Sequence, residues 1–105
     1  MRRVMVRYKV KAERAAENEE LVRAVYAALQ EAQPAGLRYA TFKLDDGLSF
    51  VHLAEHDEDQ PDQLTQLAAF KRFQEDLAER CDEPPALTTL GAVGSYRLFT
   101  DDLPR

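Results

Sequence analysis

The protein has 105 residues, a mass of 12.0 kDa and 45% hydrophobic residues, which is the size and composition of one globular domain spanning residues 1–105. Its formal net charge of −5 argues against a general affinity for nucleic acid, because phosphate backbones bind to basic surfaces. No apolar run approaches the ~20 residues that cross a bilayer, and the single cysteine, Cys81, excludes an internal disulfide and a multi-cysteine zinc site.

The first part of the chain predicts a strand followed by a helix. Residues 3–11 alternate in character, which is the two-residue period of a half-buried strand, and one face carries Val4, Val6, Tyr8 and Val10. From about residue 13 to residue 33, apolar residues recur three and four positions apart, which predicts a helix. The sequence Pro34-Ala35-Gly36 ends this helix, because proline and glycine both interrupt it.

Residues 37–44 predict a strand, and this strand is expected to form a hairpin with the strand that follows it. Asp46 and Gly47 are typical of the two-residue loop that joins such strands, because both positions require a positive φ. With these two residues as the loop, the numbers of paired positions add to 93, so that Thr41 faces His52 and Tyr39 faces Ala54. This face is semi-polar, whereas the opposite face is apolar in its centre.

Charge is unevenly distributed along the chain. Residues 1–12 hold five bases and no acid, which interrupts any apolar stretch; we therefore expect no signal peptide and a cytoplasmic location. Residues 55–62 hold five acids and no base. A cation site there would need a glycine and a defined spacing of acids, and neither is present, so we expect a solvated loop.

The last part of the chain predicts a second helix and a closing strand. The helix covers residues 62–80, with a buried stripe of Leu67, Phe70, Phe73, Leu77 and Cys81. Asp82-Glu83-Pro84-Pro85 ends it, because the residue before a proline is disfavoured in a helix. The strand is expected over residues 88–99.

The predicted order β-α-β-β-α-β is that of a ferredoxin-like α+β fold, with a four-stranded antiparallel sheet and two helices on one face. We expect the other face to carry Met5, Tyr39 and Phe50 among polar groups. Leaving that face in water would expose an apolar patch, and a second copy of the chain would cover it. The sequence therefore predicts a homodimer in which the two sheets face each other.

Three segments resemble a known family over about residues 3–99. They are Phe50-Val51-His52-Leu53-Ala54-Glu55-His56-Asp57, then Leu67-Ala68-Ala69-Phe70-Lys71-Arg72-Phe73, and finally Val93-Gly94-Ser95-Tyr96-Arg97. The chain resembles the antibiotic-biosynthesis-monooxygenase-like group of the dimeric α+β barrel superfamily. The resemblance implies a dimeric α+β barrel. It also implies kinship with oxygenases that use O2 without metal or flavin on electron-rich aromatic substrates, with haem-degrading enzymes, and with small proteins of unknown activity.

Departures from the family pattern narrow the expected activity. Haem-degrading members have an Asn on the first strand, a Trp at the end of the third strand and a His in the second helix. This chain has no Trp and lacks the other two residues at those places. His56 stands where relatives often have an aromatic residue, and Leu64 stands where they often have His. Haem degradation is therefore disfavoured, and no complete catalytic set carries over from the family.

His52 and Tyr39 are the candidate catalytic residues. A histidine near its unperturbed pKa is suited to act as the general base that deprotonates a phenol, which activates the phenol for direct reaction with O2. The alternative is a structural His52 that is hydrogen-bonded to Thr41 or to the partner chain. His52 and His56 lie roughly 13 Å apart on an extended strand, too far to share one metal ion. We expect no metal and no cofactor.

The expected ligand pocket is lined by Tyr8, Asn18, Thr41, His56 and Phe73. Each of these side chains also has a structural alternative, such as a tethered core tyrosine for Tyr8 or an interhelical hydrogen bond for Asn18. Two functions follow. One is a small cofactor-independent monooxygenase-like protein that acts on or binds an aromatic, polyketide-like molecule; the other is a non-catalytic homodimer with a ligand-binding or structural role. An apolar pocket above ~300 Å³ with a histidine or tyrosine pointing inward favours the enzyme.

Overall fold

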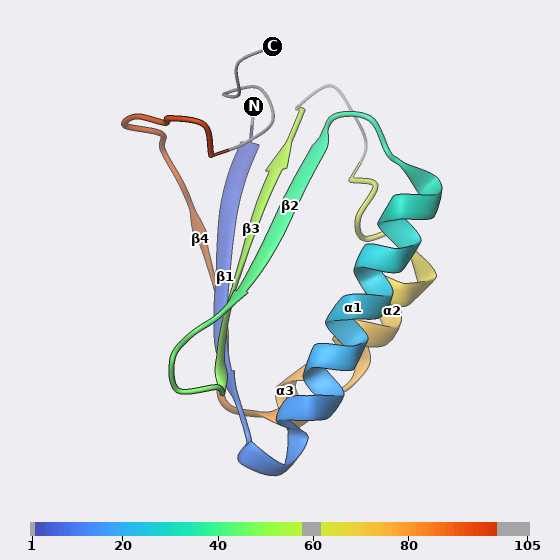
Figure 1. Ribbon diagram of the computed structural model, residues 1–105, viewed down its shortest axis with the longest axis vertical. Coiled ribbons are helices and arrows are strands. Elements are labelled where there is room, and N and C mark those ends of the chain that lie inside the picture. The colour runs from blue at the N-terminus through green and yellow to red at the C-terminus, as the bar shows by residue number, and fades with distance from the viewer. Residues whose placement is uncertain (1, 58–61, 99–105) are drawn as a thin grey trace.

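The computed structural model describes residues 2–57 and 62–98 as one antiparallel sheet with helices on one side (Figure 1). Its elements are, in order, β1 (Arg2–Val10), a short 3-10 helix (Ala12–Arg14), α1 (Ala15–Ala32), β2 (Leu37–Lys43), β3 (Ser49–His56), α2 (Ala68–Glu75), α3 (Leu77–Arg80) and β4 (Cys81–Thr89). The strand order is β2-β3-β1-β4, and every neighbouring pair is antiparallel. The predicted ferredoxin-like α+β fold is confirmed.

Neither of the two described ranges, residues 2–57 and 62–98, contains a helix that is both long enough and apolar enough to cross a bilayer. Residues 58–61 of the predicted acidic loop lie outside the described residues.

The core lies between the sheet and the helices, as the alternation in β1 predicts. Val4, Tyr8 and Val10 are buried on the covered face of β1, and Tyr8 and Val10 belong to one buried cluster with Val22 and Val25 of α1. The helix ends at Ala32, where Gln33 adopts a left-handed backbone conformation with φ of 45° and donates its N–H to the Leu29 carbonyl. The predicted end of this helix is therefore confirmed.

The hairpin between β2 and β3 has the predicted register but a longer loop. All pairs from Leu37 with His56 to Lys43 with Phe50 follow the expected pairing. The loop has four residues instead of two, because the Gly47 N–H donates to the Leu44 carbonyl at 3.0 Å and the turn centres one residue earlier. A loop that is one residue longer on each side leaves the register unchanged.

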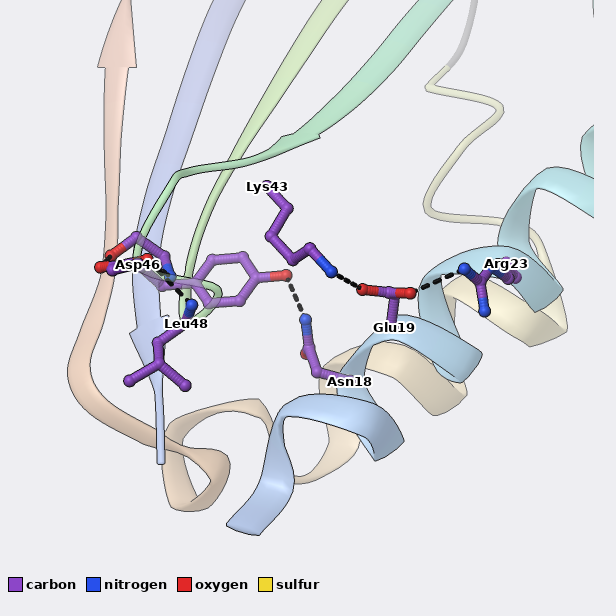
Figure 2. A network of polar contacts seen from close by, with 8 residues as sticks. Asn18, Glu19, Arg23, Lys43, Asp46 and Leu48 are labelled. Carbon is purple, nitrogen blue, oxygen red and sulfur yellow. Dashed lines mark hydrogen bonds and ion pairs between the residues drawn. The ribbon is translucent and has the colours of Figure 1, made fainter. Parts of the chain in front are cut away.

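Asp46 holds this loop through its carboxylate. It accepts the Ser49 hydroxyl at 2.6 Å and the backbone N–H groups of Leu48 and Ser49, each at 2.8 Å (Figure 2). These hydrogen bonds, led by the one from the Ser49 hydroxyl, lower the pKa of Asp46 to about 2, since they stabilise the charged form.

The prediction of which residues lie on the open face is confirmed for Met5 and wrong for Tyr39 and Phe50. Tyr39, Phe50 and His52 lie on the face that the helices cover. The reason is the register of β1 on β3, in which Val6 pairs with His52 and Tyr8 pairs with Phe50, so that these side chains share one face. The opposite face carries Met5, Ala40, Phe42, Val51 and Leu53, and Phe42 is 50% exposed there.

The second helix begins later than predicted. Residues 62–67 form turns, and α2 starts at Ala68. Leu64 nevertheless enters the core from this turn segment, with 5% of its surface exposed. Phe70 and Phe73 are buried as predicted, whereas Cys81 is buried as the first residue of β4 and not as part of a helical stripe.

The closing strand was predicted in the wrong place. β4 covers Cys81–Thr89 and includes Pro84 and Pro85, whereas residues 90–98 form no strand. β4 is an edge strand, and its pairing with β1 shifts between Arg7 and Lys9, where the two prolines stand. Proline is tolerated at edges and bulges because its missing N–H is not needed by a neighbouring strand.

Gly36 and Gly47 form a matched pair for testing the two turns. Both have a positive φ, 77° and 72°, but a Cβ on Gly36 would lie 2.8 Å from the Asp57 carboxylate, whereas a Cβ on Gly47 would meet nothing within 4 Å. Gly47→Ala should reduce the free energy of unfolding by about 1–2 kcal/mol through backbone strain alone. Gly36→Ala should reduce it further, because Asp57 must also move. Urea unfolding measures both, and an equal loss in the two variants would contradict the predicted contact.

Candidate functional site

A cavity of about 450 Å³ lies between the sheet and helices α2 and α3. Most of its walls are apolar, and a few polar side chains lie at its inner wall and its rim. The lining residues are Arg2, Val4, Val6, Tyr8, Tyr39, His52, Ala54, His56, Asp62, Leu64, Thr65, Phe70, Phe73, Gln74, Leu77, Ala78, Pro85 and Leu87. A largely apolar cavity with a few convergent polar groups is typical of a small-molecule site.

His52 lies at the centre of the inner wall, between two tyrosines. Its Nε2 lies 2.8 Å from the Tyr8 hydroxyl, and its Nδ1 forms a short hydrogen bond with the Tyr39 hydroxyl. Thr41 Oγ1 lies 3.2 Å from the same Nδ1. Strand alternation places these side chains together, because β1, β3 and β2 are adjacent and all four residues share the covered face. Both ring nitrogens of His52 therefore have hydrogen-bond partners.

Further polar residues stand behind this wall. Asn18 reaches from α1 toward the sheet and donates to the Tyr8 hydroxyl at 3.0 Å, beside the surface ion pairs of Glu19 with Lys43 and Arg23 (Figure 2). Arg80 of α3 donates from Nε to Asn18 Oδ1 at 3.2 Å.

Two of the residues behind the wall were missed at the sequence level. Tyr26 bonds to Thr41 at 2.8 Å, and its position on the helix is not marked by the apolar stripe. Arg80 was missed because a cation in the last turn of a helix ordinarily points into water. In the structure its side chain is buried: Nη2 donates to the Phe73 carbonyl at 2.7 Å, and the guanidinium lies over the Phe73 ring.

Burial shifts the protonation equilibria of all three inner-wall groups. Desolvation lowers the pKa of His52 from 6.5 to about 4, because the charged imidazolium would lose its hydration. The pKa values of Tyr8 and Tyr39 are raised, again mainly by burial, which disfavours their anionic forms. The expectation that His52 titrates near its unperturbed pKa is therefore wrong, and His52 is neutral at pH 7 in the folded protein.

Aromatic rings shape the space next to His52. The Phe73 ring lies 5.4 Å from the imidazole, centroid to centroid, and the Tyr8 ring stacks on Phe50 at 5.6 Å. On the other side, Tyr39 stacks on Tyr26 at 5.3 Å. Such contacts fix the ring orientations, so that the hydroxyl and imidazole groups are held in place.

The structure places most of the expected site residues together. Tyr8, Tyr39, His52, His56 and Phe73 all line the cavity. Asn18 and Thr41 do not line it, but each contacts a lining residue through one hydrogen bond. At the rim, His56 Nδ1 lies 4.0 Å from Asp62 Oδ1. Within residues 2–57 and 62–98, no group of three His, Cys, Asp or Glu side chains is close enough to hold a metal ion.

Comparison with known proteins gives one family and several similar structures. The model of the family described as antibiotic biosynthesis monooxygenase matches residues 1–76. None of the curated proteins matches the chain.

The similar structures share the fold at low sequence identity. A candidate antibiotic biosynthesis monooxygenase from Nitrosomonas europaea is 18% identical, with a TM-score of 0.74 over 90% of this chain and 100% of that one. Rv0793 from Mycobacterium tuberculosis is 16% identical, with a TM-score of 0.70 over 90% and 96% of the two chains. A variant of SnoaB, a cofactor-independent oxygenase from Streptomyces nogalater, is 19% identical, with a TM-score of 0.66 over 91% and 96%.

The lowered pKa of His52 predicts a specific loss of stability in acid. In the unfolded chain this histidine takes up a proton near pH 6.5, whereas in the folded protein it does so only near pH 4. The stabilising contribution is therefore complete above pH 6.5 and decreases as the pH falls toward 4, by about 3 kcal/mol in total. His52→Gln, which does not titrate, should remove this part of the pH dependence.

Urea unfolding of both proteins at pH 7 and pH 4.5 measures the difference. Carboxylates contribute equally to the pH dependence of both proteins. Only the difference between the two proteins in the free energy of unfolding lost from pH 7 to pH 4.5 is therefore attributed to His52. An equal loss in both proteins would show that His52 is not held in its neutral form.

Proposed function

The chain belongs to the antibiotic biosynthesis monooxygenase family, and we propose that it is a monooxygenase-like enzyme that oxidises an aromatic, polyketide-like small molecule with O2, without metal or flavin. The observation that carries this proposal is the cavity of about 450 Å³ in which His52 stands between Tyr8 and Tyr39. It exceeds the ~300 Å³ expected of a small-molecule site, and it has the inward-facing histidine and tyrosines that favour an enzyme. The similarity to SnoaB, a cofactor-independent oxygenase, supports the same class of reaction.

The lining of the cavity fits a flat, largely apolar ligand that carries a few oxygen atoms. Phe70, Phe73 and Leu64 supply the apolar and aromatic walls, where burial of ligand surface stabilises binding by roughly 25 cal/mol per Å². Tyr39 and His52 supply the polar groups at the inner wall. An aromatic ring with one or two hydroxyl or carbonyl oxygens matches both features.

We assign the catalytic roles to His52 and Tyr39. A bound phenol passes its proton toward the His52 imidazole, and Tyr39 hydrogen-bonds the oxygen anion that remains. In the free protein the imidazolium is disfavoured by burial, which lowers the pKa of His52 to about 4. A phenolate at the inner wall would raise that pKa again, because an opposite charge within about 4–6 Å favours the charged form. Proton transfer and anion binding therefore support each other.

The reaction balances without an external reductant. The deprotonated substrate supplies all the electrons that reduce O2. One oxygen atom forms a new carbonyl on a substrate CH2 carbon, and the other oxygen atom leaves with the two hydrogens of that carbon as water. The protein residues return to their initial protonation states, because the proton taken from the phenol returns to the phenol oxygen once the carbonyl and water have formed.

A second function, a non-catalytic ligand-binding protein, has one observation in its favour. Both ring nitrogens of His52 are already engaged by Tyr8, Tyr39 and Thr41 in the ligand-free protein. A histidine that is fully hydrogen-bonded in this way serves equally well to hold the pocket wall in place. Ligand binding without oxidation would identify this second function.

The proposed partner is a second copy of the chain, and the proposed location is the cytoplasm. Members of this family are commonly dimeric. The open face of the sheet carries Met5, Val51, Leu53 and the half-exposed Phe42, which supports pairing of two sheets. Of the three residues expected on this face from the sequence, Met5 lies there and Tyr39 and Phe50 do not, but the reason for pairing is the same.

His52→Ala should abolish turnover while leaving the fold and the dimer intact. The probe is dithranol, a phenolic anthrone, whose oxidation is followed by O2 uptake after subtraction of the rate without enzyme. Tyr39→Phe should reduce the rate by about 100- to 1,000-fold, as is typical when one hydrogen bond to a developing anion is lost. Arg23→Gln, on the far side of α1, is the matched control and should keep full activity. An unchanged rate in His52→Ala would remove this residue from the mechanism.

Light scattering should give a mass of twice 12.0 kDa for the protein in solution. Phe42→Asp should shift the equilibrium toward the single chain, because a carboxylate in the paired face would lose its hydration. Gln30→Asp, which adds the same charge to the exposed side of α1, should leave the dimer unchanged. A single-chain mass for the unmodified protein at micromolar concentration would contradict the proposed dimer.

A further inference from the structure

We propose that Arg80 and Asn18 are positioning residues that fix His52 as the tautomer protonated on Nδ1, so that the inner wall accepts a proton on its Tyr8 side and donates a hydrogen bond on its Tyr39 side. The proposal concerns the direction of each hydrogen bond in a chain of buried groups. It depends on the proposed function only for the ligand, because the tautomer is a property of the free protein.

The chain begins at a group that can only donate. The guanidinium of Arg80 has no acceptor atom, and its side chain is 1% exposed. Its Nε donates to Asn18 Oδ1 at 3.2 Å, which fixes the orientation of the Asn18 amide. The amide nitrogen of Asn18 then faces the Tyr8 hydroxyl at 3.0 Å and must donate to it.

The next two links follow from the number of donors and acceptors. The Tyr8 oxygen accepts from Asn18, so its own hydrogen needs another acceptor, and Tyr8 is 2% exposed, which leaves little access to water. The His52 Nε2, at 2.8 Å, is that acceptor. A neutral imidazole carries one hydrogen, so if Nε2 accepts, the hydrogen is on Nδ1.

The last link sets what the cavity offers to a ligand. The Nδ1 hydrogen faces the Tyr39 oxygen and, at 3.2 Å, Thr41 Oγ1. Tyr39 therefore accepts from His52 and keeps its own hydrogen for Thr41 or for an oxygen atom in the cavity. The ligand that fits is one with an acceptor oxygen, a phenolate or a carbonyl, next to Tyr39. A proton that a second ligand oxygen releases next to Tyr8 would reach Nε2, because the Tyr8 hydroxyl can pass its own hydrogen on as it receives another.

Asn18→Asp tests this direction with almost no change of shape. A carboxylate can only accept, so Asp at this position would accept from both Arg80 and Tyr8. The Tyr8 oxygen would then accept from His52, and the hydrogen on the imidazole should move from Nδ1 to Nε2. Gln30→Glu is the matched control, because it adds a carboxylate to the exposed side of α1, away from the cavity and from the chain of hydrogen bonds.

The measurement is ¹⁵N NMR of the histidine ring nitrogens in the ligand-free protein at pH 7.5. The chain has two histidines, so a His56→Gln background leaves His52 as the only signal. We expect a protonated Nδ1 in this background and in Gln30→Glu, and a protonated Nε2 in Asn18→Asp. A protonated Nε2 in the background protein, or no change in Asn18→Asp, would overturn the proposal.

A second variant keeps the test decisive if Asn18→Asp does not fold. Tyr8→Phe removes one hydroxyl and cuts the chain between Asn18 and His52. Without this link, we expect both tautomers of His52 to be populated. A pure Nδ1 tautomer in Tyr8→Phe would show that Arg80 and Asn18 do not determine it, and would also overturn the proposal.

The affinity for dithranol separately tests the predicted hydrogen bond from Tyr39 to the ligand. Asn18→Asp and Tyr39→Phe should each weaken dithranol binding by about tenfold, because both remove the hydrogen bond from Tyr39 to the ligand oxygen. Gln30→Glu should change the affinity little. Unchanged affinity in an Asn18→Asp protein whose tautomer has inverted would overturn the assigned ligand contact. Failure of dithranol and other phenols to bind the unmodified protein would instead count against the proposed function, while the NMR result would still decide the tautomer.

Discussion

The site depends on the hydrogen bonds made by the buried imidazole of His52. A polar ring that is 5% exposed must find hydrogen bonds inside the protein, since an unpaired buried polar group costs about 1–3 kcal/mol. His52 finds them on two neighbouring strands, with Tyr8 of β1 on one nitrogen and with Tyr39 and Thr41 of β2 on the other. Through Tyr8, Asn18 and Arg80, the same network reaches α1 and α3. One histidine thereby ties three strands to the helices that cover them.

This arrangement explains how a small domain keeps a cavity. The network and the stacked rings of Tyr26 and Tyr39 fill the space between α1 and the strands, so the core is packed there. Toward β4, the covering helices are short and interrupted, and the strand itself bends at its prolines. The space that remains between α2, α3 and the sheet is the cavity. The polar groups of its wall are held in place by hydrogen bonds: Tyr8 bonds to Asn18, and His52 bonds to Tyr8 and Thr41.

Local sequence patterns predicted the elements better than their faces. The alternation of β1 and the turn residues around Gly47 were enough for the strand, the hairpin and its register, because these depend on neighbours in the chain. The pairing of β1 with β3 depends on residues about fifty positions apart, and a shift by one residue would have moved Tyr39, Phe50 and His52 to the other face. The strand with Pro84 and Pro85 was missed because its pairing as a bulged edge is decided by the position of β4 in the sheet.

The site residues were predictable as types but not as a network. His52, Tyr39 and Tyr8 stood out as groups that can exchange protons, but the expected faces separated Tyr8 from Tyr39 and His52. The burial that lowers the pKa of His52, and the buried position of Arg80, are products of tertiary packing that no local pattern contains.

A crystal structure of the protein with dithranol bound would decide whether the cavity is the ligand site. We expect the ligand rings to lie against Phe73 in the cavity, with one ligand oxygen within hydrogen-bonding distance of the Tyr39 hydroxyl and with His52 still bonded to Tyr8. A ligand bound elsewhere on the molecule, or a cavity that is filled by the protein's own side chains, would contradict this expectation.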